Sequence, residues 1–362
     1  MIFKVIDYTK NASSDSEAIE KCISAASEIS GLKTVVFDEK DYYIDRAILV
    51  PSDMEIIIDG CAIRQNDEVY DNVFRGANVT VNPDNPYSHP LDVTYQKNIR
   101  ITGKNGAKVV GTSKPRIGYH QVLEEEQPMN GDFWGWRTHM FSFSYGEDIE
   151  ISGLSLSQTM GWAISFDSCS LIHIHDIEFN SNVKNGDGID FRSGCHDCVV
   201  ENITGYTSDD TVACTALSPA ERTVRPVKNY LFPAEPYNCL GLAHNRDIYN
   251  VTIKNIMTGG LHHGVICLAA RGNKVYDIAI DNVCEAKNGA RESAVKIYTG
   301  YGTGYTKGDI HDINVKNVTA QNAKYAVQID AEVEDVTLEN IVQHNPDGVL
   351  TVGADQDGVT VI

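Results

Sequence analysis

The stretch Val251-Thr252-Ile253-Lys254-Asn255-Ile256 returns 27 residues later as Ile278-Ala279-Ile280-Asp281-Asn282-Val283. In both copies apolar residues alternate with polar ones, which is the period of a β-strand, until an asparagine interrupts the alternation. Asparagine tolerates the left-handed backbone conformation, so it can turn a strand through a corner. The motif therefore predicts short strands joined at an asparagine bend.

The same motif recurs over much of the chain, with Asn, Gly or Asp in the bend position. Where no longer segment intervenes, neighbouring bends are 23 to 35 residues apart. Repeats of this length predict one coil each of a right-handed parallel β-helix, in which stacked asparagines can hydrogen-bond along the axis. Two other repeat folds fit less well. A leucine-rich repeat would need a leucine scaffold, which this sequence lacks, and a propeller would need more hairpin turns within each repeat. The bend residues are Gly153, Asp176, Asn202, Asn255, Asn282, Asn317 and Asn340.

The N-terminal segment carries a helix pattern. Ser14 stands three residues before Glu17, which is the spacing of a capping box. An apolar stripe follows at helical spacing, and an open-ended solenoid needs such a cap. We therefore predict an all-β protein, one parallel β-helix domain over residues 1–362 whose N-terminal cap spans about 1–33. The stripe consists of Ala18, Ile19, Cys22, Ile23, Ala26 and Ile29.

Charge and composition exclude several classes of protein. The 362 residues include 50 acidic against 30 basic ones, a net charge of −20, and such a surface disfavours nucleic acid. No run approaches the roughly 18 apolar residues that span a bilayer, and the first residues lack the pattern of a signal peptide. We therefore expect a cytoplasmic protein with neither nucleic acid nor membrane as a partner.

The nine cysteines are odd in number and widely scattered, which argues against a disulfide framework. Cys195-His196-Asp197-Cys198 resembles half of a metal clip, but no second pair stands at useful spacing. We interpret the cysteines as small buried hydrophobic residues. No metal or cofactor is expected.

Three aspartates fall at the spacing of one coil. Asp187 precedes Asp209 by 22 residues, and Asp210 follows directly. Because neighbouring coils stack about 4.8 Å apart, these carboxylates should crowd into one patch. Crowding pushes their pKa values apart, so that one carboxyl stays protonated while another is ionised. A general acid and a general base across a glycosidic bond need this arrangement, although a single Asp-Gly pair more often marks a turn.

Four motifs in order resemble the polygalacturonases, glycoside hydrolase family 28. The family signatures N-T-D, D-D, G-H-G and R-I-K correspond here to Asn185-Gly186-Asp187, Asp209-Asp210, His262-His263-Gly264 and Val295-Lys296-Ile297. The similarity is good from about residue 137 to 305 and weaker over the first 60 residues. It implies a pectin-lyase-like β-helix with its catalytic coils at about 137–305.

The resemblance also implies a role for each matching residue. Asp209 would be the general acid that protonates the leaving oxygen. Asp187 and Asp210 would hold and deprotonate the attacking water, which inverts the anomeric centre, and His263 would support the acid by hydrogen bonding. The residues expected to bind the sugar are Asn185, Lys296 and Tyr298.

This chain departs from the family pattern at two positions. Gly186 replaces the threonine of N-T-D, and Val295 stands where the family has an arginine that would grip a substrate carboxylate. We expect Val295 at a strand edge facing the cleft. The sugar bound there should be neutral unless another cation replaces the arginine and binds the substrate carboxylate. Candidates are Arg222, Arg225 and Lys228 in an inserted segment that could form a substrate wall, and Arg271 and Arg291.

These observations predict an inverting, metal-independent glycoside hydrolase. Its substrate would be an imported oligosaccharide, from pectin or another glycan, and long insertions that could close one end of the cleft favour exo-action. Two alternatives stay open at this point: a lyase or glycosyl-transferring enzyme on the same scaffold, and a non-catalytic carbohydrate-binding solenoid such as a phage tail or adhesin segment. Homo-oligomers are compatible with all of these.

Overall fold

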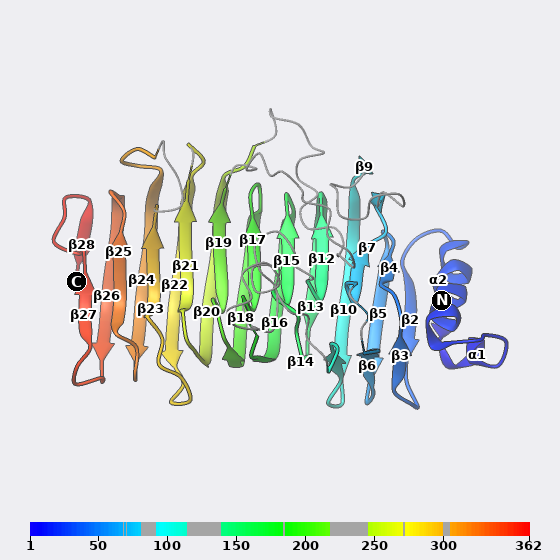
Figure 1. Ribbon diagram of the computed structural model, residues 1–362. Coiled ribbons are helices and arrows are strands. Elements are labelled where there is room, and N and C mark those ends of the chain that lie inside the picture. Colours follow the sequence, from blue (N-terminus) through cyan, green and yellow to red (C-terminus); the bar gives the residue numbers. More distant parts are fainter. Residues whose placement is uncertain are drawn as a thin grey trace, which may run out of the picture.

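The computed structural model describes residues 1–67, 69, 71–80, 92–113, 139–183, 185–217, 245–270, 272–299 and 305–362. Over these residues the chain winds into a right-handed parallel β-helix, as predicted (Figure 1). The coils follow one another from the helical N-terminal end to β28 at the opposite end. Paired strands keep strict parallel register over this length, apart from one short antiparallel pair, β8 (Val79–Thr80) with β9 (Asp92–Val93).

The larger sheet among the described residues has sixteen strands. Its longest strands bend at a corner, so that each one covers two faces of its coil. These strands are the repeats recognised in the sequence. In spatial order they are β1 (Ile2–Lys4), β2 (Lys33–Phe37), β5 (Met54–Asp59), β10 (Gln96–Lys104), β13 (Gly146–Ser152), β16 (Ser170–Ser181), β18 (His196–Thr207), β20 (Ile248–Gly260), β22 (Val275–Glu285), β24 (Ile310–Ala320), β26 (Glu334–Gln343) and β28 (Val359–Val361), joined off this path by β3 (Tyr42–Ile44), β6 (Ala62–Gln65), β11 (Lys108–Val110) and β14 (Ser155–Ser157).

A second sheet, with ten described strands, closes the remaining face of the coils. The turns that lead into its strands carry the aspartates and histidines singled out above. From the C-terminal end these strands are β27 (Val349–Val352), β25 (Tyr325–Asp330), β23 (Ser293–Tyr298), β21 (His263–Ala269), β19 (Val212–Ala216), β17 (Ile189–Arg192), β15 (Ile164–Asp167), β12 (Phe141–Ser144), β7 (Phe74–Gly76) and β4 (Ile48–Val50).

The predicted bends are confirmed. Asn202 and Asn255 have φ values of 58° and 56°, in the left-handed region. Their side chains also form the expected ladder: Nδ2 of Asn255 donates to Oδ1 of Asn202 at 3.0 Å, and Asn282 donates to Asn255 at 2.9 Å. The ladder is interrupted once, where Asn317 donates to Asp281 instead of to its counterpart one coil below.

Each of these coils has a second left-handed corner that the motif analysis missed. It lies five residues before the asparagine bend, so the long strands turn twice rather than once. Aspartate or asparagine occupies this position in most coils, for the same reason as at the first corner. The residues are Asp148, Leu171, Asp197, Asn250, Asp277, Asp312 and Asp335.

The interior is filled by stacked apolar rows. Val200, Ile253 and Ile280 lie directly above one another in neighbouring coils and are at most 1% exposed. A row of phenylalanines lines the ten-stranded sheet, with Phe166 and Phe191 ring centroids 5.9 Å apart. Burying each such side chain contributes about 1.5–3 kcal/mol, so the repeat pattern itself supplies the core.

Helices α1 (Ile6–Thr9) and α2 (Asp15–Ser27) stand at the N-terminal end, where α2 covers the first coil (Figure 1). The Ser14 side chain accepts a hydrogen bond from the Glu17 N–H at 3.2 Å, as the capping box predicts. The Glu17 carboxylate accepts from the Ser13 N–H, one residue before the expected partner. The apolar stripe packs inward, so the predicted cap is confirmed. Among the described helices, none has the length and apolar character needed to cross a membrane.

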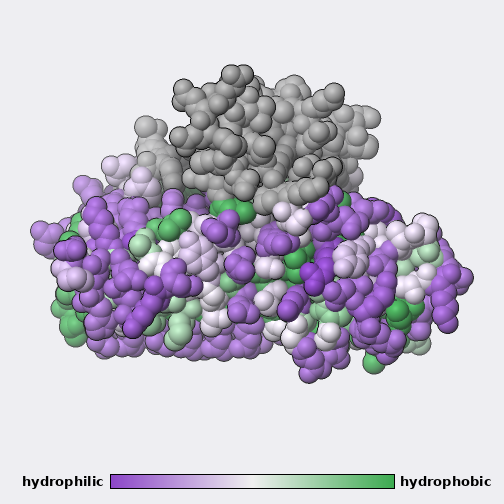
Figure 2. Space-filling model, turned by 60° about the horizontal axis from the view of Figure 1, so that its bottom comes forward, coloured by the Kyte–Doolittle hydropathy of each residue, from purple (hydrophilic) through white to green (hydrophobic). Residues whose placement is uncertain are grey.

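Most of the coloured surface in Figure 2 is hydrophilic, with small hydrophobic patches within it.

The two cysteines of Cys195-His196-Asp197-Cys198, which resembles half of a metal clip, lie in the core. Burial raises the pKa of Cys195 to about 12, and it raises the pKa of Cys198 well above the usual value. Both thiols stay protonated at neutral pH and make poor metal ligands, since a metal binds the thiolate.

Candidate active site

Three carboxylates meet where two neighbouring strands of the ten-stranded sheet begin. Asp187 lies just before β17, and Asp209 and Asp210 lie just before β19. The N–H of Gly188 donates to the carbonyl of Asp210 at 2.8 Å, which holds the two turns in register. One oxygen from each of the three carboxylates lies within 4.8 Å of the others. The crowding expected from the coil spacing is therefore confirmed, and all three side chains are largely buried.

Two consecutive histidines from the next coil reach the same carboxylates. His263 is buried, and its Nδ1 lies 2.7 Å from Oδ1 of Asp210. His262 is half exposed, and its Nδ1 lies 3.0 Å from Oδ1 of Asp209. His263 was expected beside Asp209, but in the structure it contacts Asp210, and the histidine beside Asp209 is His262, in the position where the family signature has glycine. Two adjacent histidines on one turn diverge, so that each serves its own aspartate.

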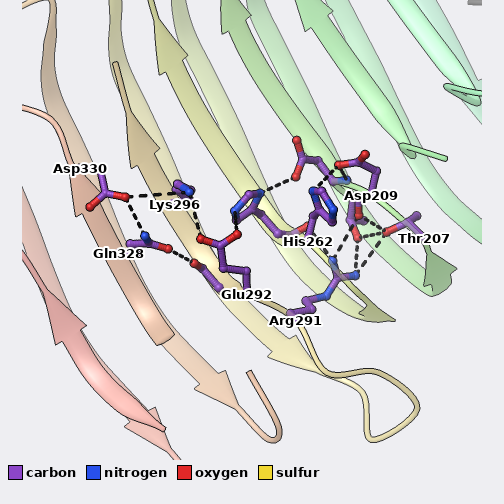
Figure 3. Close-up of polar contacts among 12 residues, drawn as sticks. Thr207, Asp209, His262, Arg291, Glu292, Lys296, Gln328 and Asp330 are labelled. Carbon is purple, nitrogen blue, oxygen red and sulfur yellow. Dashed lines mark hydrogen bonds and ion pairs between the residues drawn. The ribbon is translucent and has the colours of Figure 1, made fainter. Parts of the chain in front are cut away.

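Arg291 lies beneath this cluster and was expected to be a candidate for the substrate. The structure excludes that role, because Arg291 is only 2% exposed. Its guanidinium donates to the carbonyls of His263 and Gly259, each at 2.6 Å, and to the hydroxyl of Thr211 at 2.8 Å. The hydroxyls of Thr207 and Thr258 accept further bonds (Figure 3).

The buried guanidinium holds together the turns that carry the catalytic candidates. Removal from water lowers the pKa of Arg291 to about 10, against the opposing influence of Asp210 and Glu285, so Arg291 keeps its charge at neutral pH. Sequence reasoning missed this role, since nothing in a linear motif marks an arginine as facing inward.

The structure contradicts the expected position of Val295. Its side chain is fully buried in the core, between Val265 and Val327 of the strands on either side. Side chains alternate along a strand, so Val295 and Ile297 point inward and Lys296 points outward. The motif comparison therefore placed Val295 on the wrong side of β23, and the outward position next to it belongs to Lys296.

Lys296 lies in a network of carboxylates on the outer side of β23 (Figure 3). Its Nζ is 3.2 Å from Oε1 of Glu292 and 3.9 Å from Oδ2 of Asp330, and it is 4.8 Å from the ring centre of Tyr298. Gln328 donates to Asp330 at 2.6 Å. Lys296, Gln328 and Asp330 therefore extend the line of polar side chains from β17, β19 and β21 to the next two strands, β23 and β25.

Glu292 connects the lysine to the histidines and was not foreseen. Its Oε2 lies 3.7 Å from Nε2 of His263, while Oε1 faces Lys296. Burial acts to raise the pKa of Glu292, but Lys296 and His263 outweigh it and lower the pKa below its usual value. Glu292 is therefore ionised at neutral pH. The sequence shows that Glu292 directly follows Arg291, but it does not show that His263 and Lys296 lie beside this carboxylate.

Asn185 and Gly186 form the turn that presents Asp187. Asn185 has a φ value of 52°, and asparagine is one of the few residues that adopt this left-handed backbone conformation readily. Sugar binding by its side chain stays a prediction. A Cβ atom at Gly186 would lie 2.3 Å from Oγ of Ser208 and 2.9 Å from the carbonyl of Val183. Glycine is required at this position in this chain, which explains the departure from N-T-D.

We expect Gly186→Ala to destabilise the fold by about 1–3 kcal/mol, because the added methyl group overpacks the contact between two coils. The turn that carries Asp187 would also shift, so kcat should fall together with stability. Urea unfolding of the two proteins checks the first effect. Gly106→Ala is an informative comparison, since the space around Gly106 is open although its φ of 79° strains any side chain. Equal stability of Gly186→Ala and the parent protein would contradict the packing argument.

Trp162 lies in the coil before the one that carries Asp187. Trp162 is 5% exposed and lies between His139, whose ring stacks on it at 5.0 Å, and the guanidinium of Arg192 at 4.5 Å. It is therefore a packed, largely buried side chain. The cations proposed for the inserted segment, Arg222, Arg225 and Lys228, lie outside the described residues, as does Arg271.

Neither a protein-family model nor a curated protein sequence matches this chain. Solved structures do match its fold. The polygalacturonase from Erwinia carotovora ssp. carotovora aligns with 97% of this chain and 94% of its own, with a TM-score of 0.64 and 13% identity. The fold is that of the polygalacturonases. The endo-xylogalacturonan hydrolase from Aspergillus tubingensis aligns with 100% of this chain and 91% of its own, with a TM-score of 0.60 and 15% identity.

The same fold also occurs in proteins described in other terms. A tailspike protein mutant of Escherichia coli bacteriophage HK620, solved in complex with a pentasaccharide, aligns with 97% of this chain and 64% of its own, with a TM-score of 0.60 and 12% identity. At such identities the likeness establishes the β-helix alone. The chemistry has to be argued from the site.

Proposed function

We propose that this protein is an inverting glycoside hydrolase acting on an oligosaccharide. One observation carries the proposal: three carboxylates lie within 4.8 Å of one another at one edge of the ten-stranded sheet, and a histidine lies within hydrogen-bonding distance of two of them. Paired acids of differing protonation are what glycosidic cleavage requires. The family resemblance of the motifs and the shared fold support the same reaction.

In this mechanism Asp209 protonates the glycosidic oxygen as the bond to the anomeric carbon breaks. The water is held by Asp187 and Asp210, loses its proton to this pair and attacks the anomeric carbon from the opposite face. His262 positions Asp209, and His263 positions Asp210. Arg291 keeps the turns in place from below and acts only through them.

The stereochemistry is open to a direct test. Carboxylate oxygens within 4.8 Å are closer than the roughly 6.5–9.5 Å between carboxyl groups that is usual for inversion, and nearer to the roughly 5–5.5 Å of retaining enzymes. Our proposal of inversion rests on the third carboxylate, since two aspartates together can hold the water. Proton NMR of the first product formed distinguishes the two outcomes, and a retained anomeric configuration would overturn the inverting mechanism.

The charges around the site favour a neutral sugar beside Lys296. Five described carboxylates face two cations, Lys296 and the buried Arg291; with Asp209 protonated as the general acid and both histidines neutral, the net charge is −2. The carboxylates are Asp187, Asp209, Asp210, Glu292 and Asp330. A uronate would meet this negative field, and Lys296 is already paired with Glu292. We therefore propose that a neutral sugar residue occupies this subsite. Exo-action on an imported oligosaccharide and a cytoplasmic location are separate parts of the proposal.

The experiment that tests the function is hydrolysis of defined oligosaccharides with product detection by chromatography. Matched neutral and uronic disaccharides are compared by kcat/KM, and we expect the neutral ones to be favoured. Efficient cleavage of digalacturonate would overturn the neutral subsite while preserving the hydrolase. A product that absorbs in the ultraviolet would instead identify a lyase, and the absence of turnover on all substrates would favour a binding solenoid.

Activity should survive both EDTA and dithiothreitol. Carboxylates activate the water in the proposed mechanism, and the eight cysteines that the structure describes are free thiols, so neither reagent has a catalytic target there. The measurement is kcat/KM before and after exhaustive dialysis with each reagent. Loss of turnover that returns on adding Ca²⁺ or Zn²⁺ would contradict the carboxylate mechanism.

A further inference from the structure

A second cluster of chemically active side chains lies on the sixteen-stranded sheet, apart from the carboxylate site. His173 and His175 alternate with the buried Ile172 and Ile174 on β16, so both imidazoles face outward from the same side of one strand. Their ring centres are 4.4 Å apart. We propose that this pair, with Glu150 of β13 and Glu201 of β18, forms a binding site for a divalent transition-metal ion of the zinc class.

The two glutamates approach the histidines diagonally from the neighbouring coils. Oε1 of Glu201 lies 2.9 Å from Nε2 of His173, and Oε1 of Glu150 lies 3.4 Å from Nε2 of His175. Four ligands at Zn–N and Zn–O distances of about 2.0–2.2 Å stand roughly 3.3 Å from one another in a tetrahedron. The distance within each pair suits that geometry. One ligand atom each of Glu150, His173 and His175 falls within 4.8 Å of the others, so small side-chain rotations bring these three together. Glu201 meets the group at His173, and its carboxylate has to rotate toward the other two ligands to complete the site.

The surroundings orient these groups as the outer partners of a metal site do. Nδ1 of His175 lies 2.7 Å from Oδ2 of Asp176, which fixes the hydrogen on Nδ1 and leaves Nε2 to bind a metal. Asp176 is itself held by Nδ2 of Asn202 at 3.0 Å. A ligating histidine that donates its other N–H to a carboxylate is a recurrent arrangement in metal sites.

The flanking cations hold the glutamates without occupying the oxygens that face the histidines. Arg100 pairs with Oε2 of Glu150 at 3.4 Å, and Lys254 pairs with Oε2 of Glu201 at 2.9 Å, so both Oε1 atoms stay turned inward. Four carboxylates surround the site against these two cations, a net charge of −2 with neutral histidines, which a divalent ion balances. The carboxylates are Asp148, Glu150, Asp176 and Glu201.

The ligands come from three successive coils, β13, β16 and β18. A bound ion would therefore join these coils on the face of the solenoid that carries none of the proposed catalytic groups. Two imidazoles with two carboxylates suit Zn²⁺ better than Ca²⁺ or Mg²⁺, which prefer oxygen ligands. The role that follows is stabilisation of the fold, independent of glycoside hydrolysis.

The test is zinc binding to the full chain after removal of metal by EDTA. Isothermal titration with ZnCl₂ is compared between the parent protein and His173→Gln/His175→Gln, and thermal unfolding is followed with and without zinc. We expect the double variant to lose one equivalent of zinc and the corresponding rise in Tm, while its metal-free Tm stays close to that of the parent. Any zinc held by Asp210, His262 and His263 would persist in both proteins.

Two single variants sharpen the test. Asp176→Asn keeps the left-handed corner and should weaken zinc affinity about 10–100-fold, because it removes the carboxylate that orients His175. His311→Gln is the matched control: Nδ1 of His311 lies 2.7 Å from Asp312, as in the His175 pair, but its ring stacks on Tyr276, and no histidine of the described residues pairs with it. Its affinity should be unchanged. Identical isotherms for the parent and the double variant, whether both bind zinc or neither does, would overturn the proposal.

Discussion

Replacing Asp209 with asparagine should lower kcat at least about 10³-fold on an oligosaccharide with an unactivated leaving group. Asparagine keeps the shape of the side chain but has no acidic proton to give to the glycosidic oxygen. A 10³-fold loss corresponds to about 4 kcal/mol of activation barrier. The measurement is steady-state kcat on the best substrate found in the disaccharide comparison.

A change of leaving group separates an acid from a merely structural residue. On an aryl glycoside, whose leaving group needs little protonation, Asp209→Asn should recover much of the lost rate. Asp197→Asn is the matched control, since Asp197 also contacts a histidine, His196 at 2.8 Å, but lies on an outer corner of the coil. A fully active Asp209→Asn, or an equal loss on both substrates, would refute the assignment of the acid.

Val295→Arg should unfold the protein or reduce its free energy of unfolding by about 3–5 kcal/mol. The side chain at this position is 0% exposed and packed between two neighbouring core valines, so the guanidinium would be buried without a partner. Such a loss is a large part of the roughly 5–15 kcal/mol that holds most domains together. Urea unfolding measures it directly.

Lys296→Arg is the natural control, because it places the same guanidinium one residue later, on the outer side of β23. Its stability should stay within about 1 kcal/mol of the parent protein, since the charge stays beside Glu292 and Asp330. Similar stability of the two variants would show that the register of this strand is wrong. Because Lys296→Arg places an arginine on the outer side of β23, its kcat/KM on digalacturonate also tests whether that cation governs the choice of sugar.

The sequence alone determined the architecture of this protein, because each coil repeats its own local rules. Alternation of apolar residues defined the strands, and a residue that tolerates positive φ defined each corner, as at Asn202 and Asn255. The 22-residue spacing of Asp187 and Asp209 was enough to predict that they meet, since coils stack in register. In a solenoid, distance along the chain converts into position along the axis.

What faces the cleft and what faces the core was decided by the tertiary structure. A shift of one residue reverses the side of a strand on which a side chain lies, so the motif comparison placed Val295 in the cleft although it is buried. Arg291 looked like a surface cation and proved to be the hydrogen-bonded support beneath the catalytic turns. The pairing of His262 with Asp209, and of His263 with Asp210, likewise depends on side-chain direction at the start of β21. These contacts join coils whose residues are far apart in the chain, and their geometry depends on packing that no local pattern records.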